Sequence, residues 1–272
     1  MSVDPTSTEQ RARFILQPRD ILLILFIFYA TIVTRNQILL AGFWGSVVRC
    51  NTRLRTLVAA RYLVRLRSEF DRQSLYGLGP AAAALIATEL GIDIETVKRQ
   101  ARIGQSVQFL THTLRIVDVH LAFATAAKQT GIAFLWRSER QVRHEYKTRE
   151  GTRWQTHILK PDGMARFGDA GSYRHCYVEC DLSHRSSAAM GALFSSYCHY
   201  RANVFTEIYG ASSFVVLCIV PGARRLSHLQ AVAQSVGADF VRFTTYDQLF
   251  SVGPLGPIWL TPAGTVPVSL LP

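Results

Sequence analysis

Acidic residues in the C-terminal half of the chain have the types and spacing of a divalent-cation site. Asp162 lies in a KPDG turn, whose proline and glycine fix the backbone. Glu179 and Asp181 lie two residues apart in the segment 175–181, which predicts a strand with both acids on one face. Hard cations prefer carboxylate oxygens, and phosphodiester hydrolysis uses such cations to stabilise charge on the reacting oxygens. Asp162 and Glu179, with Glu139, are therefore candidate metal ligands.

A second set of candidate residues lies on a predicted helix near the N-terminus. Ser46 can cap this helix, and apolar residues repeat along one face at helical spacing: Val47, Cys50, Leu54, Leu57 and Val58. The opposite face is basic and polar, with Arg49, Thr52, Arg53 and Thr56, and with Arg55 at its flank. A short helix over 35–41, which Thr34 can cap, and a turn precede it. The segment therefore predicts a helix-turn-helix whose second helix enters the DNA major groove.

The segments that follow this helix predict a β-hairpin, or wing. Strands are expected over 62–66 and 75–78, with a polar turn between them, and Arg65, Arg67 and Arg72 would then lie near the DNA phosphates. Eight arginines and two acids lie between positions 35 and 72, a local charge of +6 out of the formal +11 of the whole chain. Double-stranded DNA is the partner that this distribution favours. The alternative is a solvated basic face on a winged helix that binds protein.

The composition sets limits on the class of protein. With 49% hydrophobic and 18% charged residues in 272, the chain is expected to fold rather than to be disordered. The net charge of +11 favours an anionic partner such as nucleic acid or an acidic membrane surface. Only four of the 30 basic residues are lysines, and arginine suits bidentate contacts to phosphate and guanine, although a GC-rich genome would give the same bias.

The cysteines and the longest apolar run bear on localisation. Five widely spaced cysteines favour a reducing compartment, so we expect a cytoplasmic protein with buried free thiols. A zinc site is the alternative, and its ligands would be Cys176, Cys180, Cys198 and His199. The apolar run 21–33 is shorter than the roughly 20 residues that a spanning helix needs. It predicts a buried core helix and no membrane association.

The remaining pattern predicts an α/β domain behind the winged helix. We expect a winged helix-turn-helix over 1–80, a helical linker over 81–110 and an α/β domain over 111–272. In the last of these, a helix over 111–128 precedes three strands, at 132–136, 154–159 and 175–181. Further elements are expected in the order helix 190–204, strand 213–220, helix 226–236, strand 240–244 and short helix 246–250.

Several stretches resemble the replication-relaxation family of plasmids and other mobile elements. They are PRDILLIL, TRNQILL, RCNTRLRTLVAARYLVRL and LYGLG in the N-terminal part, and WRSE, KPDG, YVECD and FTTYDQL…GPIW further on. Together they span residues 18–261, and their order and spacing are more specific than any one of them. The resemblance implies a winged helix followed by a domain similar to the PD-(D/E)XK nucleases, with a mixed central sheet.

The resemblance also assigns roles to the acids. It implies that Asp162 is the first acid of the nuclease motif and Glu179 the second. The motif requires a lysine two residues after the second acid, and this chain has Asp181 there. Lys160, two residues before Asp162, is the candidate to take its place in space. Because the lysine that orients the attacking water is missing, a degenerate, non-catalytic nuclease-like domain is favoured.

Three functions follow from these observations. The leading one is a DNA-binding protein of a plasmid or other mobile element, acting in replication, mobilisation or DNA processing. It would act as a homodimer or with other replication or mobilisation proteins. The first alternative is a Mg²⁺-dependent DNA endonuclease that uses Asp162, Glu179 and Lys160, with Glu139 as a third metal ligand. The second is a transcriptional regulator of a mobile element.

Overall fold

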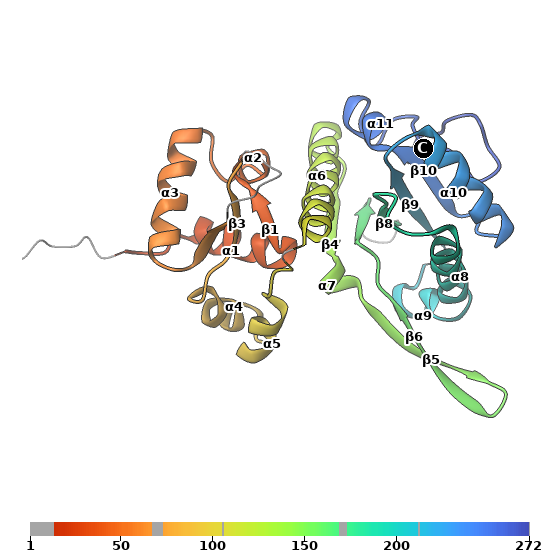
Figure 1. Ribbon diagram of the computed structural model, residues 1–272, viewed down its shortest axis with the longest axis horizontal. Helices are drawn as coiled ribbons and strands as arrows, with labels where there is room; N and C mark the ends of the chain where they lie inside the picture. The colour runs from red at the N-terminus through yellow and green to blue at the C-terminus, as the bar shows by residue number, and fades with distance from the viewer. Residues whose placement is uncertain (1–13, 67–72, 105, 169–172, 212, 272) are drawn as a thin grey trace, which may run out of the picture. The chain divides into compact units, whose positions relative to one another are not determined.

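The computed structural model describes residues 14–66, 73–104, 106–168, 173–211 and 213–271 of the chain. The chain divides into two compact units, residues 1–103 and residues 104–272, which form the N-terminal and the C-terminal unit (Figure 1). The sequence predicted a helical linker over 81–110. In the structure, the part of this segment up to residue 103 belongs to the N-terminal unit.

The N-terminal unit combines short helices with a small antiparallel sheet. Its described elements are α1 (Pro18–Ala30), β1 (Ile32–Thr34), α2 (Arg35–Leu40), α3 (Val47–Ala59), β2 (Leu63–Leu66), β3 (Leu75–Leu78), α4 (Ala82–Leu90) and α5 (Ile94–Gln100). The strands pair in the order β1-β3-β2, so the β2–β3 hairpin joins the rest of the unit through β3. Buried apolar residues of α1, among them Leu23 and Ile27, supply much of the core.

The two predicted helix caps are confirmed. The Thr34 hydroxyl accepts a hydrogen bond from the Gln37 amide at 3.1 Å, and the Gln37 side chain accepts one from the Thr34 amide at 2.9 Å. This reciprocal pair is a capping box, and it starts α2. The Ser46 hydroxyl accepts from the Arg49 amide at 3.3 Å and starts α3. Both helices therefore begin at the predicted residues.

The predicted core helix over 21–33 is wrong at its C-terminal end. α1 ends at Ala30, and Thr31 with φ of 72° turns the chain into β1. Ile32 and Val33 lie opposite Gly77 and Tyr76 of β3. Pairing with a strand more than 40 positions away decides this conformation, and the apolar run itself cannot show it. Among the described residues, we find no helix whose length and apolar character would let it cross a membrane.

A mixed five-stranded sheet forms the centre of the C-terminal unit, in the order β10-β9-β8-β7-β4. β8 (Arg174–Cys180), β9 (Phe214–Val220) and β10 (Val241–Thr245) are parallel. β7 (Gly163–Phe167) is antiparallel to both of its neighbours, β8 and β4 (Phe134–Ser138). The prediction of an α/β fold with a mixed central sheet is confirmed at this level.

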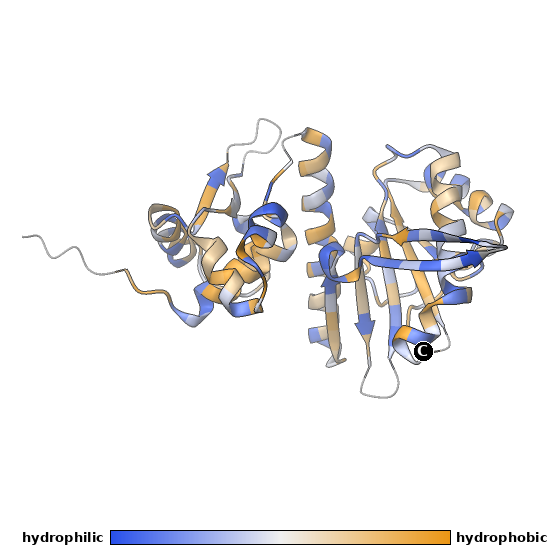
Figure 2. Cartoon of the chain, turned by 90° about the horizontal axis from the view of Figure 1, so that it is seen from below, coloured by the Kyte–Doolittle hydropathy of each residue, from blue (hydrophilic) through white to orange (hydrophobic). Residues whose placement is uncertain are grey.

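Helices cover both faces of this sheet. α8 (Ser187–Asn203) and α10 (Ala223–Ser235) pack on the face that carries Tyr177 and Cys218. α6 (Val107–Thr130) and α11 (Tyr246–Ser251) pack on the face that carries Cys176 and Val178. The strands alternate between the two cores, and in Figure 2 the central strands are largely hydrophobic. α7 (Glu139–Val142) and α9 (Phe205–Tyr209) are short.

Two strands escaped prediction between positions 131 and 181. One is β7, which begins directly after Asp162. The other is β5 (His144–Glu150), which pairs with β6 (Arg153–Leu159) in a two-stranded antiparallel ribbon separate from the central sheet. Figure 1 shows this ribbon extending away from the strands and helices of the unit. We call β5, β6 and their connecting turn the arm.

Candidate functional site

Helix α3 presents a basic and polar surface to solvent. Cys50, Leu54 and Leu57 are buried, as predicted for the inner face. The side chains of the outer surface are exposed or half-buried, and they are Arg49, Thr52, Arg55 and Thr56. Val47, which was expected on the inner face, is exposed because the first turn of α3 extends beyond the core.

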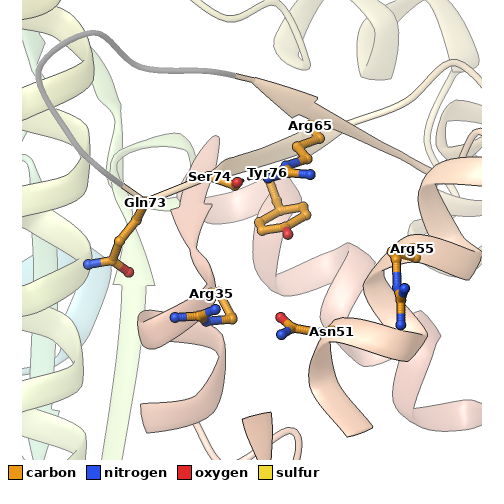
Figure 3. A pocket seen from close by; sticks show the side chains of 7 residues that line it. All are labelled: Arg35, Asn51, Arg55, Arg65, Gln73, Ser74 and Tyr76. Atoms are coloured by element: carbon orange, nitrogen blue, oxygen red, sulfur yellow. Dashed lines mark hydrogen bonds between the residues drawn. The ribbon is translucent and has the colours of Figure 1, made fainter. Parts of the chain in front are cut away.

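A basic pocket of about 460 Å³ opens beside α3 (Figure 3). Its described lining residues come from α2, α3 and the β2–β3 hairpin, and they are Arg35, Asn51, Arg55, Arg65, Gln73, Ser74 and Tyr76. None of these seven residues is acidic. Arg65 donates a hydrogen bond from Nε to the Ser74 hydroxyl at 2.7 Å, which fixes its guanidinium at the rim. The Nε atom of Arg35 is buried and has no hydrogen-bond partner in the part of the chain that the structure describes. The described lining, with three arginines and no acid, is chemically suited to an anion.

Arg53 points away from this surface. Its Nε atom donates to Oδ1 of the buried Asp20 at 2.9 Å, and a second guanidinium nitrogen bonds the other carboxylate oxygen. It also donates to the Ile15 carbonyl at 2.9 Å and lies over the ring of Phe14. The hydrogen bond to Asp20 raises the pKa of Arg53. Arg53, predicted to contact DNA, instead joins α3 to the start of α1.

Of the other predicted DNA contacts, Arg65 lines the basic pocket. Arg67 and Arg72 lie outside the described residues. Arg35, Asn51 and Tyr76 were not singled out from the sequence. Arg35 belongs to the arginine-rich stretch that was recognised, whereas no local signal distinguishes Asn51 or Tyr76.

The two principal acids come together in the C-terminal unit. Gly163 of β7 lies opposite Val178 of β8, so Asp162 and Glu179 reach the same end of this strand pair. Both side chains are buried. Burial and the negative charge of Asp162 raise the pKa of Glu179 to about 8, and contacts with Arg185 and Tyr197 limit the rise. The predicted convergence of these two carboxyl groups is therefore present in the fold.

Other groups of the chain bind the Asp162 carboxylate. Its Oδ2 atom accepts a hydrogen bond from the Cys180 amide at 2.7 Å. His112 Nε2 lies 3.3 Å from the same oxygen and 2.9 Å from the Cys180 carbonyl oxygen. Burial would lower the pKa of His112, but the hydrogen bond and charge of Asp162 outweigh it, and the pKa is raised. Two oxygens thus lie close to one nitrogen of the His112 ring, and this arrangement favours the protonated imidazole.

The other acids are also paired. Tyr197 donates its hydroxyl to Glu179 Oε1 at 2.7 Å, and Arg185 donates to Oε2 at 3.1 Å. Asp181, just beyond the end of β8, receives two hydrogen bonds from Arg225, at 2.7 and 3.0 Å. Each carboxyl group of this acidic cluster, which we define as Asp162, Glu179 and Asp181, therefore has a basic side chain as its partner.

Lys160 and Glu139 form a separate pair. Lys160 Nζ lies 2.5 Å from Glu139 Oε1, and both side chains are substantially exposed. The structure shows this pair on the surface at the ends of β6 and β4 and records no bond from either residue to the acidic cluster. The structure therefore shows no contact through which Lys160 or Glu139 would act together with Asp162 and Glu179.

The alternative zinc ligands are divided between two layers. Cys176 and Cys180 lie in the core beneath α6, whereas Cys198 and His199 belong to α8, and Cys198 packs against the core on the opposite face of the sheet. The sheet separates the two pairs, so they do not form one site. Among the described residues, no group of three or more histidine, cysteine, aspartate or glutamate side chains is arranged to hold a metal ion.

An aromatic contact explains the glycine after Asp162. A Cβ atom at Gly163 would lie 2.4 Å from Cζ2 of Trp136 on β4. Trp136 in turn stacks on His120 of α6, with ring centroids 4.7 Å apart. The indole therefore packs directly against the β7 backbone and holds the residue next to Asp162 in place. This contact joins the WRSE and KPDG stretches of the sequence.

His112, Arg185 and Arg225 were not identified as site residues from the sequence. His112 was interpreted as an ordinary helix residue, and it lies 50 positions before Asp162. Arg185 and Arg225 lie in a loop and a helix whose local patterns are unremarkable. Only Arg185 carries a usable signal, because it is a basic residue shortly after two acids.

Comparison with known proteins identifies the family of this chain. No curated protein matches the chain. Among solved structures, that of the restriction endonuclease FokI is similar to 84% of this chain and 41% of its own, at 11% identity and a TM-score of 0.30. The chain thus spans about two fifths of that protein, and a TM-score this low does not establish a shared fold. The model of the family described as replication-relaxation matches residues 26–213, more than half of the chain, and the protein belongs to that family.

Proposed function

We propose that this protein binds double-stranded DNA through its N-terminal unit, which acts as a winged helix-turn-helix. The order of elements supports this, because α2, a turn and α3 precede the β2–β3 hairpin, the place of a wing. α3 would enter the major groove, with Arg49 and Thr52 toward base edges and Arg55 toward the backbone. Membership of the replication-relaxation family supports a role in replication or mobilisation of a plasmid or other mobile element.

The basic pocket is the observation that carries this proposal. A DNA phosphate is an anion of the right charge for a cavity lined by Arg35, Arg55 and Arg65. The buried Nε of Arg35, which has no hydrogen-bond partner among the described residues, could donate a hydrogen bond to a phosphate oxygen. Because helix and hairpin both line the pocket, a phosphate held there would fix the register of α3 in the groove.

We further propose that the C-terminal unit is a nuclease-like domain without metal-dependent catalysis. The support is the donor set of the acidic cluster, in which protein groups already occupy the carboxylate oxygens. His112 lies between Asp162 and the Cys180 carbonyl, and Arg185 is bound to Glu179. A divalent cation would have to displace these partners, so the residues as arranged do not fit one. Asp181 stands where a nuclease motif requires lysine, and Lys160 is bound elsewhere.

The DNA-binding proposal is tested by the salt dependence of binding. The affinity of the full chain for a labelled 30-base-pair duplex is measured by fluorescence anisotropy between low and moderate salt. The Arg55→Ala/Arg65→Ala variant should bind more weakly, and the slope of log K against log salt should fall by about 2, since each phosphate contact contributes about 0.9.

The matched control is Arg99→Ala/Arg102→Ala, which removes two exposed arginines of the same unit outside the pocket. It should leave the slope unchanged. If both double variants lower the slope equally, general charge and not this surface accounts for binding, and the assignment of α3 and the hairpin is wrong.

A further inference from the structure

The arm has two faces that differ in chemistry. β5 and β6 pair without interruption from His144 opposite Leu159 to Glu150 opposite Arg153, and the turn of Gly151 and Thr152 joins them. Successive residues of a strand point to opposite sides. In Figure 2 the arm is mostly hydrophilic, unlike the central strands of the same unit.

The inner face fixes the base of the arm on α8. Tyr146 stacks on His157 with ring centroids 5.1 Å apart, and His157 stacks on His199 of α8 at 4.2 Å. The Tyr146 hydroxyl and Nδ1 of His199 lie within hydrogen-bond distance, 2.9 Å. Thr148 is hydrogen-bonded to His157 at 2.7 Å. The base of the arm is therefore held in one orientation, which leaves the other face outward.

The outward face combines two cations with exposed apolar surface. Lys147 lies opposite Thr156 and Arg149 opposite Trp154, and all four side chains are exposed. Trp154 is 68% exposed, and Ile158, four residues further along β6 on the same face, is 54% exposed. Trp154 is the one tryptophan among the exposed large hydrophobic residues of the described chain. Exposed apolar surface of this kind, bordered by polar side chains, is typical of binding surfaces.

The acidic residue of this face is neutralised within the arm. Glu145 bonds Arg143 at 2.9 Å, at the base of the outward face. No ion pair among the described residues engages Lys147 or Arg149, although Arg149 Nε donates to the Gly151 carbonyl at 3.2 Å. The two cations are thus free to meet an anionic partner beside the exposed indole.

We propose that the outward face of the arm, namely Lys147, Arg149, Trp154, Thr156 and Ile158, binds an unpaired DNA strand. The combination of aromatic surface and adjacent cations is that of single-strand binding sites, in which bases stack on the rings and cations follow the phosphates. A duplex would satisfy Lys147 and Arg149 equally well. It offers Trp154 no stacking partner, however, because its base faces are covered by neighbouring base pairs.

The site is separate from the duplex-binding surface proposed above, since it lies in the other unit. A protein with both could bind a duplex and a strand released from pairing at the same time. This inference does not depend on the function of α3, and each can fail alone.

The test uses the full chain and a labelled 20-nucleotide oligo-dT, with a 20-base-pair duplex in parallel. Trp154→Ala should weaken oligo-dT binding about tenfold, within the range measured for loss of one base–aromatic stack. Lys147→Ala/Arg149→Ala should weaken it and reduce its salt dependence. Trp154→Phe, which keeps an aromatic ring, should retain most of the affinity. Duplex affinity should change less than twofold in the two Trp154 variants, because a duplex has no open base face to stack on the ring.

Two controls match these changes. Ile208→Ala removes an exposed apolar side chain of α9, and Lys128→Ala/Arg224→Ala removes one exposed lysine and one exposed arginine of the same unit. Neither should alter oligo-dT binding. Oligo-dT should also quench the indole emission of the wild type, and Trp154→Phe should abolish that quenching.

Three results would overturn the proposal. The first is oligo-dT affinity in the arm variants equal to that in the controls. The second is an equal loss of duplex and oligo-dT binding, which would make the arm a general DNA contact. The third is a concentration-dependent self-association that Trp154→Ala abolishes while oligo-dT affinity stays unchanged, which would make the arm a contact between copies.

Discussion

His112 Nε2 lies 3.3 Å from Oδ2 of Asp162, although 50 residues separate them in the chain. The same nitrogen lies 2.9 Å from the Cys180 carbonyl oxygen, so one imidazole is held by the first acid and by the residue that follows Glu179. This relationship bears directly on chemistry. A carboxylate oxygen that protein groups already contact is available to a metal ion only if those contacts are displaced.

Incubation of supercoiled DNA with the purified protein and Mg²⁺ or Mn²⁺ should give no nicking. Asp162→Ala and Glu179→Ala should leave duplex affinity unchanged, because the proposed DNA contacts are in the other unit. Gel electrophoresis of the plasmid forms measures the first, and anisotropy the second. Nicking by the wild type that disappears in both variants would instead establish a metal-dependent nuclease, since loss of a metal ligand removes several kcal/mol of charge stabilisation.

The unfolding free energy should fall as pH rises toward 8. Glu179 has a pKa raised to about 8, so the folded chain keeps a proton that the unfolded chain loses near the ordinary value of 4.5. The stability from this proton is complete below that ordinary value and is lost as pH rises to about 8. The raised pKa of His112 acts in the same direction, from its ordinary value of 6.5 upward. One proton changes stability by at most about 1.4 kcal/mol per pH unit.

Chemical denaturation at pH 5, 6.5 and 8 measures this dependence. Glu179→Gln should flatten the fall in stability, whereas Glu207→Gln, at an exposed position on α9, should leave it as in the wild type. An unchanged slope in Glu179→Gln would show that the proton is not held there.

Arg53→Ala should destabilise the N-terminal unit. The substitution leaves the buried Asp20 carboxylate without its cation, and breaking a buried ion pair costs roughly 3 kcal/mol. Arg49→Ala, at an exposed position of the same helix, should cost less than about 0.5 kcal/mol. Denaturant titrations compare the two. In Asp20→Ala/Arg53→Ala the combined loss should be smaller than the sum of the single losses, and strict additivity would argue against the pair.

Gly163→Ala should be destabilising even though alanine is small. The new Cβ would meet the Trp136 ring, which His120 keeps from moving aside, and such overpacking costs about 1–3 kcal/mol. Gly191→Ala on α8 is the control, because its Cβ would lie 3.6 Å from the nearest atom and alanine favours a helix. Thermal unfolding should rank Gly191→Ala at or above the wild type and Gly163→Ala below it. The reverse order would contradict the packing described for Trp136.

Local signals predicted several elements correctly. Thr34 and Ser46 mark the starts of α2 and α3 because a cap depends on residues three positions apart. β5 was missed because its charged side chains lack the apolar alternation of a half-buried strand. β7 was missed because it is short and begins at a glycine, which normally indicates a turn.

The site was predictable only in part, for a related reason. The residue types of Asp162 and Glu179 indicate possible metal ligands, and the antiparallel pairing of β7 and β8 brings the two side chains together. Their partners His112, Arg185 and Arg225 come from three other segments, and no short-range pattern records which cation a fold will bring to which acid. Arg53 shows the same limit, because helical periodicity gave the face of its Cα but not the direction of its long side chain.

The bond between Arg53 and Asp20 has a consequence for how this protein could diversify. It orients α3 from its flank, and among the described residues no hydrogen bond or ion pair joins the exposed positions 49, 52 and 55 to α1. Substitutions at those three positions therefore change the surface that α3 presents while its anchor stays intact. Under the DNA-binding role proposed for α3, members of this family could acquire new target sequences one residue at a time, without passing through an unstable ancestor.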